Sequence, residues 1–409
     1  MAIANSITKS STNAVPLTSF DDACGLIAAE ARILGTEYVA LDHADGRTLA
    51  APAIAQRTSP AVLVSAMDGY AVRDFDISAL PTSLPVAGQS FAGAPFAGDL
   101  PFGACVRIFT GAAAPAGTER VIIQEEVHEE NGVALFRAPL SARRHLRLPG
   151  SDFAKGDVIV PAGSILSPQR LVGIAAADLA ALEVFRQPRV AILCCGDELA
   201  DPGHGMGMQG KIPESISYGI AALIHRWGGI VATRLRRGDD LSELQTAAIE
   251  AAALADLVVV IGGASIGEKD FAKRAFSVLG LNLIFSKVAI KPGKPVWFGR
   301  IRDALVLGLP GNPASAMITG RLFLAPLLAG LGGANPANAL DWRIMRAGAP
   351  LAGCAERDTF MRAVTAARTA VPLRSQDSAD QKSLADATHL IRLRREDAAP
   401  HSLVETLVL

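Results

Sequence analysis

The chain has 409 residues, and its 39 Lys and Arg against 40 Asp and Glu give a formal net charge of −1. This balance leaves no basic excess to hold a nucleic-acid backbone, so nucleic acid is not an expected partner. At about 150 residues per domain, the length predicts two to four domains. A composition of 50% hydrophobic and 19% charged residues excludes a disordered chain.

The sequence predicts neither a membrane span nor a targeting segment. The two longest uncharged stretches, 77–98 and 322–340, are interrupted by Pro and Gly, so neither can form a spanning helix of about 20 apolar residues. The N-terminal stretch before Phe20 contains one Lys and lacks the apolar core of a signal peptide. A cytoplasmic location without a membrane partner is therefore expected.

Cysteine and histidine usage limits the metal chemistry. The five cysteines are scattered and form no CxxC pair, and the seven histidines show no ligand spacing. A zinc site built on thiolate or imidazole is therefore not expected, and any bound metal would be a hard cation held by carboxylates.

In chain order, the first predicted element is a helix that begins after an N-cap at Thr18 or Ser19 and runs to about Leu34. Residues 38–147 contain short β-like runs separated by Pro and Gly, which predicts a mostly β region. A turn at 161–164 then leads into a helix predicted within 167–182.

Residues 188–331 show the clearest architecture. Apolar strand candidates (RVAILCC, IVATRL, LVVVIGG, LNLIFSKV, ALVLGLP) alternate with helix candidates (SYGIAALIHRW, LSELQTAAIEAAALA, KDFAKRAFSVL, PASAMITGRLFLAPLL). This alternation predicts a largely parallel sheet with helices on both faces. A Gly- and Pro-rich linker at 332–338 indicates a smaller β-rich domain in the remaining C-terminal residues.

Three loops follow strands of this sheet, at 196–199, 262–270 and 308–315. Ligands of such sheets bind at the carboxyl ends of the strands. The glycines of the second and third loops, including Gly262 and Gly263, let backbone N–H groups approach an anion. Taken singly, each loop is better explained as an ordinary strand-to-helix turn, which needs no ligand. Together they predict one anion-binding edge.

Lysines lie between the second and third loops. Lys287 precedes the segment KPGKP, whose Pro and Gly residues predict an irregular turn that presents Lys291 and Lys294. Two fixed ammonium groups suit a small dianion or a phosphate. A solvated surface loop is an equally good interpretation of this segment alone.

Carboxylates also follow these strands. Glu198, Asp239 and Asp270 would repel an anionic ligand unless a divalent cation bridged them to phosphate oxygens, which predicts a Mg²⁺-dependent phosphate site. For Asp239 and Asp240, the helix-capping start GDDLSE is an open alternative.

Seven segments, in chain order, resemble the molybdopterin molybdotransferases of the bacterial MoeA and gephyrin E-domain type. They are SAMDGYAVR, the TGA to QEE segment from Thr110 to Glu126, LPGSD with the following Gly, CCGDEL, GGASIGEKD, KPGKP and GLPGNPAS. Physical reasoning alone identifies the first three as turns. Their order along most of the chain makes the resemblance specific.

The resemblance implies a multidomain α/β plus β-rich fold with a central three-layer α/β domain of the molybdopterin-binding type. It implies four parts: residues 1–50 with 148–187, 51–147, 188–331 and 338–409. It also implies an elongated homodimer whose site is shared between the α/β domain of one subunit and the β-rich regions of the other. The activity implied is the last step of molybdenum cofactor biosynthesis: molybdenum passes from molybdate to adenylylated molybdopterin, AMP is released, and apo-molybdoenzymes receive the product.

Residue roles carried over from the resemblance fall into three groups. The catalytic group is Asp68, Thr110, Asp152, Glu198, Asp239 and Asp270. Among these, Glu198, Asp239 and Asp270 are the expected Mg²⁺ ligands. The substrate-binding group is Arg147, Asp197, Gly262, Gly263, Ser265, Lys287, Lys291, Lys294, Pro310, Pro313, Ser315, Arg357 and Ser378.

The sequence departs from the family pattern in three places. Pro213 and Glu214 lie in the segment 211–216, where an Asp-Ser-Asn-like stretch is usual. Asp377 stands where a Gly normally precedes the Ser, and Thr388 stands near a usual Asn. These departures keep open a non-catalytic molybdopterin-binding carrier or scaffold beside molybdenum insertion. A further alternative is a molybdopterin adenylyltransferase, because the α/β domain also resembles that sibling family.

Overall fold

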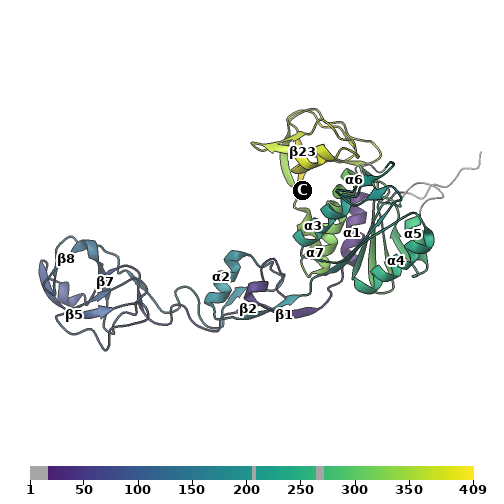
Figure 1. Ribbon diagram of the computed structural model, residues 1–409. Helices are drawn as coiled ribbons and strands as arrows, with labels where there is room; N and C mark the ends of the chain where they lie inside the picture. The colour runs from purple at the N-terminus through teal and green to yellow at the C-terminus, as the bar shows by residue number, and fades with distance from the viewer. Residues whose placement is uncertain (1–16, 205–208, 264–270) are drawn as a thin grey trace, which may run out of the picture. The chain divides into compact units, whose positions relative to one another are not determined.

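The structure is a computed structural model that describes residues 17–204, 209–263 and 271–409 (Figure 1). The chain forms two compact units. Unit 1 is Met1–Glu37, Gly46–Thr48 and Phe185–Leu409, and unit 2 is Tyr38–Asp45 and Leu49–Val184. Strands β1 (Thr36–Ala40) and β12 (Ala181–Phe185), which pair with each other, lead the chain from unit 1 to unit 2 and back.

A six-stranded sheet forms the centre of unit 1. Its order is β16 (Ile230–Arg237), β13 (Arg189–Cys195), β17 (Leu257–Ile261), β21 (Ala304–Leu309), β20 (Trp297–Ile301), β18 (Asn282–Phe285). The first four strands are parallel, which confirms the largely parallel sheet, and β20 pairs antiparallel with both of its neighbours, β21 and β18. Sequence analysis did not predict β20.

Helices cover both faces of this sheet, as Figure 1 shows. The two layers are α1 (Phe20–Glu30), α3 (Ile216–Arg226), α6 (Pro313–Thr319) and α7 (Ala325–Leu331) on one face, and α4 (Leu241–Leu254) and α5 (Phe271–Ser277) on the other. Alternate residues of β13 point to opposite cores, with Ile192 packing in the first and Leu193 in the second. The three-layer α/β domain is thus confirmed.

Helix α1 belongs to the core of unit 1, where Phe20 and Ile27 are buried. The Ser19 hydroxyl accepts a hydrogen bond from the Asp22 N–H at 3.1 Å, which confirms the predicted N-cap. The helix ends at Glu30 rather than near Leu34, because the backbone of Ala31 leaves helical geometry with ψ of 72°. The four-part domain division, which grouped residues 1–50 with 148–187, stays a prediction.

One helical stretch of the described residues, Pro313–Leu331, is long and apolar enough to cross a membrane by length and composition. It comprises α6, a π-helical segment at Gly320–Leu324, and α7. Its most apolar window is 94% buried inside the protein. That burial is typical of a core helix in a folded domain.

The C-terminal part of unit 1 is a closed sheet. Its strands are β19 (Ile290–Lys291), β22 (Arg343–Ala347), β23 (Asp358–Ala366), β24 (Thr369–Pro372), β25 (His389–Leu393) and β26 (Leu403–Val408). The order β23-β24-β22-β26-β25 closes because β25 also pairs with β23, and β19 adds a short parallel strand to β23. We call this sheet, with α8 (Gln381–Asp386) and a 3-10 turn at Pro336–Leu340 before it, the C-terminal barrel.

Unit 2 is mostly β, as expected. Its main sheet has the order β7 (Arg120–Ile123), β4 (Gly69–Val72), β6 (Cys105–Ile108), β5 (Thr82–Ser90), β9 (Val133–Phe136), β8 (Val127–Glu130). Shorter pairs are β3 (Val64–Ser65) with β10 (Leu146–Arg147) and β2 (Ala53–Ile54) with β11 (Val158–Val160). The 3-10 turns are Leu41–His43, Phe75–Ile77 and Gln124–Glu126. Helix α2 (Pro168–Ala176) is shorter than predicted: Asp178 has φ of 70°, outside the helical region, and β12 follows.

Gly308 lies inside β21, opposite Trp297 of β20. A Cβ at position 308 would lie 1.9 Å from the indole Nε1 of Trp297, which is itself fully buried. Glycine is therefore required in this strand so that the indole can pack against the backbone. The sequence analysis placed Gly308 in a ligand-binding loop; its position instead explains the packing of the antiparallel edge.

We expect Gly308→Ala to lower the free energy of unfolding by about 1–3 kcal/mol, the usual range for overpacking a core. Urea denaturation monitored by tryptophan fluorescence measures this. Gly311→Ala is the control, because the atom nearest to a Cβ at position 311 would be the Cα of Gly262, at an ordinary contact distance of 3.5 Å. Equal stability of the two variants would contradict the packing role of Gly308.

Candidate active site

The described parts of the three predicted loops, which for the second are Gly262 and Gly263, lie at one edge of the central sheet. The register places Cys194, Ile261 and Leu309 in one row across β13, β17 and β21, and each loop begins within two residues of that row. The sheet order also reverses at β13, because β16 lies on one side of it and β17 on the other. This is a topological switch point, where open α/β sheets bind their ligands.

A cavity of about 610 Å³ lies at this edge, and we call it the edge cavity. Six residues proposed from the sequence line it: Glu198, Asp239, Gly262, Gly263, Pro310 and Pro313. Glu214, Pro295, Asn312 and Gln381 also line it and were not proposed as site residues. The sequence signal for Asn312 was present in GLPGNPAS, whereas nothing in the sequence marked Gln381.

Gly262 shapes the floor of the edge cavity. Its φ is 85°, and a Cβ there would lie 2.6 Å from the carbonyl oxygen of Cys195. Both observations require glycine, because a side chain would strain the backbone and push β13 and β17 apart. Gly262 and the following Gly263 therefore present their backbone, without side chains, to the cavity.

Carboxylates line one side of the cavity. Asp197 accepts a hydrogen bond from the Asp239 N–H through Oδ1 at 3.0 Å, which joins the loop after β13 to the loop after β16. The ammonium group of Lys211 donates to the Asp197 carbonyl oxygen. The side chain of Asp240 instead caps α4 by accepting from the Glu243 N–H at 2.9 Å. The capping interpretation thus holds for Asp240, while Asp239 lies in the cavity wall.

Mg²⁺ is compatible with this donor set. Magnesium in phosphate sites is commonly held by one or two carboxylates, with phosphate oxygens and water filling its other positions. Glu198 and Asp239 supply two such carboxylates in one cavity. Among the residues that the structure describes, no group of three or more His, Cys, Asp or Glu is placed to hold a metal. The third expected ligand, Asp270, lies outside the described residues, as does Ser265.

Glu214 has a structural role at the cavity wall. It is buried, and its carboxylate accepts from the Ser217 N–H at 2.8 Å and from the Ser217 hydroxyl at 2.5 Å. Ser215, the N-cap residue of α3, makes no side-chain cap bond, so Glu214 satisfies the start of the helix instead. This departure from the family pattern therefore helps to hold the wall of the edge cavity.

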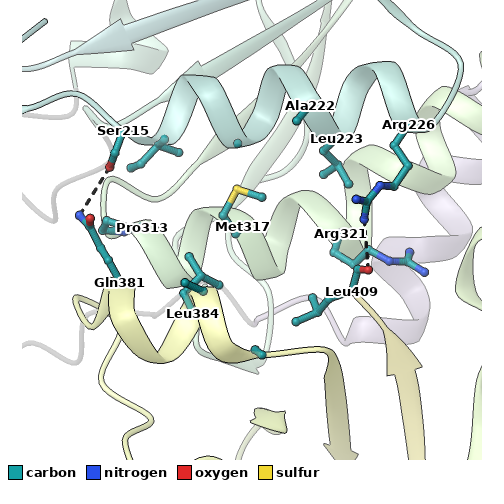
Figure 2. A pocket seen from close by; sticks show the side chains of 14 residues that line it. Ser215, Ala222, Leu223, Arg226, Pro313, Met317, Arg321, Gln381, Leu384 and Leu409 are labelled. Carbon is teal, nitrogen blue, oxygen red and sulfur yellow. Dashed lines mark hydrogen bonds between the residues drawn. The ribbon is translucent and has the colours of Figure 1, made fainter. Parts of the chain in front are cut away.

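The C-terminal barrel forms another wall. The Ser378 carbonyl accepts from the Ala314 N–H at 3.0 Å, and the Asn312 side chain donates to the Ser378 hydroxyl at 3.1 Å. Figure 2 shows Gln381 of α8 directed toward Ser215 at the start of α3, with 3.5 Å between Nε2 and Oγ. The structure thus places Ser378 beside the GLPGNPAS turn.

A second, mostly apolar cavity of about 460 Å³ adjoins the first (Figure 2). Leu223, Met317 and Leu384 contribute to its lining, and Arg226 lies at one end, where it donates to the Leu409 carbonyl oxygen at 3.3 Å. Pro313 and Gln381 line both cavities. The two cavities therefore meet beside the N-terminal end of α6.

Several proposed substrate-binding residues do not line the edge cavity. They are Asp197, Lys287, Lys291, Lys294, Ser315, Arg357 and Ser378. Lys291 lies in strand β19, paired with Thr359, and not in the irregular turn predicted for KPGKP. This pairing brings the lysine next to the barrel segment that contains Arg357. Ser315 is buried within α6, and its carbonyl accepts from the Thr319 hydroxyl at 2.7 Å.

In unit 2, the structure joins two of the proposed residues, Asp68 and Thr110, directly. Asp68 Oδ1 accepts from both the N–H and the hydroxyl of Thr110, at 2.8 and 2.7 Å. Arg147 pairs with Val64 of β3, and Asp152 donates its N–H to the Ser59 carbonyl at 3.1 Å. The bonds from Thr110 lower the pKa of Asp68 below its ordinary value, with a smaller contribution from Arg107.

Comparisons with known proteins fit this geometry. The family described as "MoeA N-terminal region (domain I and II)" matches residues 18–177, and the one described as "Probable molybdopterin binding domain" matches 191–330. A molybdopterin molybdenumtransferase of Haemophilus influenzae is 40% identical over 299 residues, 73% of each chain. The chain belongs to the MoeA family.

Other MoeA relatives agree. A molybdopterin molybdenumtransferase of Nostoc sp. is 34% identical over 73% of this chain and 70% of its own. The crystal structure of a molybdopterin biosynthesis MoeA protein from Pyrococcus horikoshii covers 96% of this chain and 100% of its own, with a TM-score of 0.82 and 25% identity. The expected fold class is confirmed by this MoeA structure, and the curated relatives are transferases.

The Asp68 carboxylate of this MoeA-family chain gives a titration test. Thr110→Val removes the hydroxyl donor and keeps the N–H donor, so we expect the pKa of Asp68 to rise toward the ordinary value of 3.8 without reaching it. Because the folded pKa is depressed, the stabilisation by Asp68 is complete above 3.8 and is lost as the pH falls through the folded value. A ¹³C NMR titration of the carboxyl measures the shift; an unchanged pKa would reject the hydroxyl bond.

Glu214 gives a stability test. Glu214→Ala leaves the buried N–H and hydroxyl of Ser217 without their acceptor, so we expect the free energy of unfolding to fall by about 1–3 kcal/mol. Glu214→Gln, which keeps one acceptor oxygen, serves as the matched variant and should lose less. Chemical denaturation compares the three proteins. An alanine variant as stable as the parent would show that the carboxylate does not cap α3.

Proposed function

We propose that this chain inserts molybdenum into molybdopterin at the edge cavity. The observation that carries the proposal is the convergence of three loops at the switch point of a domain that matches a molybdopterin-binding family. The curated relatives are named molybdopterin molybdenumtransferases, which supports the same activity here.

The substrates of the proposal are adenylylated molybdopterin and molybdate, and AMP is the leaving group. The exposed backbone of Gly262 and Gly263 binds and orients the phosphates. Glu198 and Asp239 hold Mg²⁺, which when bound offsets the negative charge of those phosphates. Positioning and charge neutralisation account for most of the catalysis in phosphoryl transfer, so no protein nucleophile is needed.

Lys291 and Arg357 are the proposed contacts of molybdate. Molybdate is a tetrahedral dianion, and a site for it needs fixed cationic donors. The pairing of Lys291 with Thr359, two residues beyond Arg357, supports placing both cations on the same side of the barrel. Lys287, Lys294, Ser315 and Ser378 complete the proposed group.

The proposal extends to the assembly and location of the chain. A homodimer would let Asp68, Thr110, Arg147 and Asp152 of the partner subunit close the site, as the family resemblance implies. The two hydrogen bonds from Thr110 to Asp68 support a joint role for these two side chains. The cytoplasm is the proposed location, and apo-molybdoenzymes are the proposed recipients.

The test follows AMP release by the purified protein from adenylylated molybdopterin and Mg²⁺, with and without molybdate, and then reconstitution of an apo-molybdoenzyme. We expect molybdate-dependent AMP release and a reconstituted enzyme. Pterin binding without AMP release would instead favour a carrier. Formation of the adenylylated pterin from molybdopterin and Mg-ATP, without insertion, would favour an adenylyltransferase.

A matched pair of variants tests the metal role. Asp239→Asn removes a carboxylate from the cavity wall and should lower Mg²⁺-dependent AMP release by about 100-fold, in the range for losing one electrostatic contact to the transition state. Asp240→Asn is the control: it changes the adjacent carboxylate, and asparagine also caps helices well. Equal rates for the two variants would remove Asp239 from the site.

A further inference from the structure

Arg362 is a buried cation that bonds to a single loop. It lies in β23 and is only 1% exposed. Its guanidinium donates to three carbonyl oxygens: Asp380 at 3.3 Å, Ser375 at 3.1 Å and Asp377 at 2.8 Å. Its Nε is buried and has no hydrogen-bond partner among the described residues. The side chain is thus oriented toward the carbonyls of residues 375–380, which we call the barrel loop.

The main chain at the same position holds the loop as well. Gln376 accepts from the Arg362 N–H at 2.9 Å and donates through Nε2 to the Arg362 carbonyl at 3.0 Å. The Leu373 N–H donates to the Arg362 carbonyl at 2.9 Å. One strand residue therefore anchors both the entry and the body of the loop.

The barrel loop in turn contacts the edge cavity. Its Ser378 accepts from the Ala314 N–H and from the Asn312 amide, both at the start of α6. Ala379 and the adjoining Gln381 line the cavity directly. The barrel loop therefore connects Arg362, which bonds to its carbonyls, with the cavity wall, which bonds to its Ser378, although Arg362 itself does not line the cavity.

The carboxylates of Asp377 and Asp380 favour the charged form of the Arg362 guanidinium. Burial lowers the pKa of Arg362, and the nearby Asp380 and Asp377 oppose that shift. Asp377 Oδ1 also accepts from the Ala379 N–H at 2.9 Å, within the loop. Each of the three carbonyls also accepts a local hydrogen bond: Ser375 from the Ser383 hydroxyl, Asp377 from the Asp380 N–H and Asp380 from the Leu384 N–H. The guanidinium joins all three to β23, so we expect its removal to loosen the loop relative to β23 while these local bonds remain.

We propose that Arg362 is a positioning residue that sets the substrate affinity of the edge cavity by holding the barrel loop against the start of α6. This inference rests on the proposed function for its kinetic readout. Its structural readout, which is the protection of the Ala314 amide from hydrogen exchange, does not depend on that function.

The experiment compares Arg362→Met with Arg321→Met in the full chain. Arg321 is a matched control because it is also buried and donates to the carbonyls of Val408 and Ala339, neither of which belongs to the barrel loop. For Arg362→Met we expect hydrogen exchange at Ala314 to accelerate at least about tenfold. We also expect KM for adenylylated molybdopterin to rise about tenfold with kcat within about twofold, since the wall binds substrate without touching the reacting atoms.

Arg362→Lys distinguishes positioning from bulk stability. Lysine keeps the charge and can reach some of the carbonyls, so it should restore part of the KM and part of the Ala314 protection. A fall in Tm like that of Arg321→Met, with KM and Ala314 exchange unchanged, would overturn the inference. If Arg362→Met does not fold, Gln376→Glu loosens the same loop, and unchanged KM and exchange there would also overturn it.

If the parent protein shows no molybdenum transfer, the proposed function fails. The hydrogen-exchange experiment still decides whether Arg362 holds the barrel loop against the start of α6. Faster exchange at Ala314 in Arg362→Met would then support the link between barrel and α/β domain. Unchanged exchange would reject it independently of any activity.

Discussion

The parallel register of β13, β17 and β21 is the constraint on which the site depends. Because Cys194, Ile261 and Leu309 share one row, the loops that follow them begin at the same height. The reversal of sheet order at β13 opens a space between the loop after β13 and the loop after β17. Gly262 keeps that space narrow at its base, since its backbone packs against the Cys195 carbonyl. The position of the cavity thus follows from backbone geometry before any side chain contributes chemistry.

Periodicity and turn chemistry in the sequence were sufficient to predict most of this framework. The parallel strands are continuous apolar runs, as expected for strands covered on both faces, and the Ser19 cap is a local signal. Strand β20 was missed because Trp297–Ile301 follows a Pro- and Gly-rich segment and lacks a helix before it. Helix α1 was predicted too long because the apolar pattern continues past Glu30, where the backbone turns toward α7.

The candidate site was predictable only in part, for a physical reason. Residues that follow strands of one sheet, such as Glu198 and Gly263, could be placed together because parallel strands end at a common edge. Contributions from the barrel could not, because nothing local shows that Gln381 lies against α3 or that Arg362 is buried. An arginine in a strand is usually solvated, and its burial here depends on a loop thirteen residues further along the chain.

The structure explains two of the departures from the family pattern, Asp377 and Glu214. Asp377 adds negative charge to a loop beside the proposed anion-binding edge, which would disfavour an oxyanion if the carboxylate faced the ligand. Its Oδ1 instead accepts a hydrogen bond within the loop, its carbonyl accepts from Arg362, and it does not line the edge cavity. Glu214 likewise directs its carboxylate into the start of α3. In both cases the added negative charge is compensated by local donors, so the departures are compatible with an anionic substrate at the same edge.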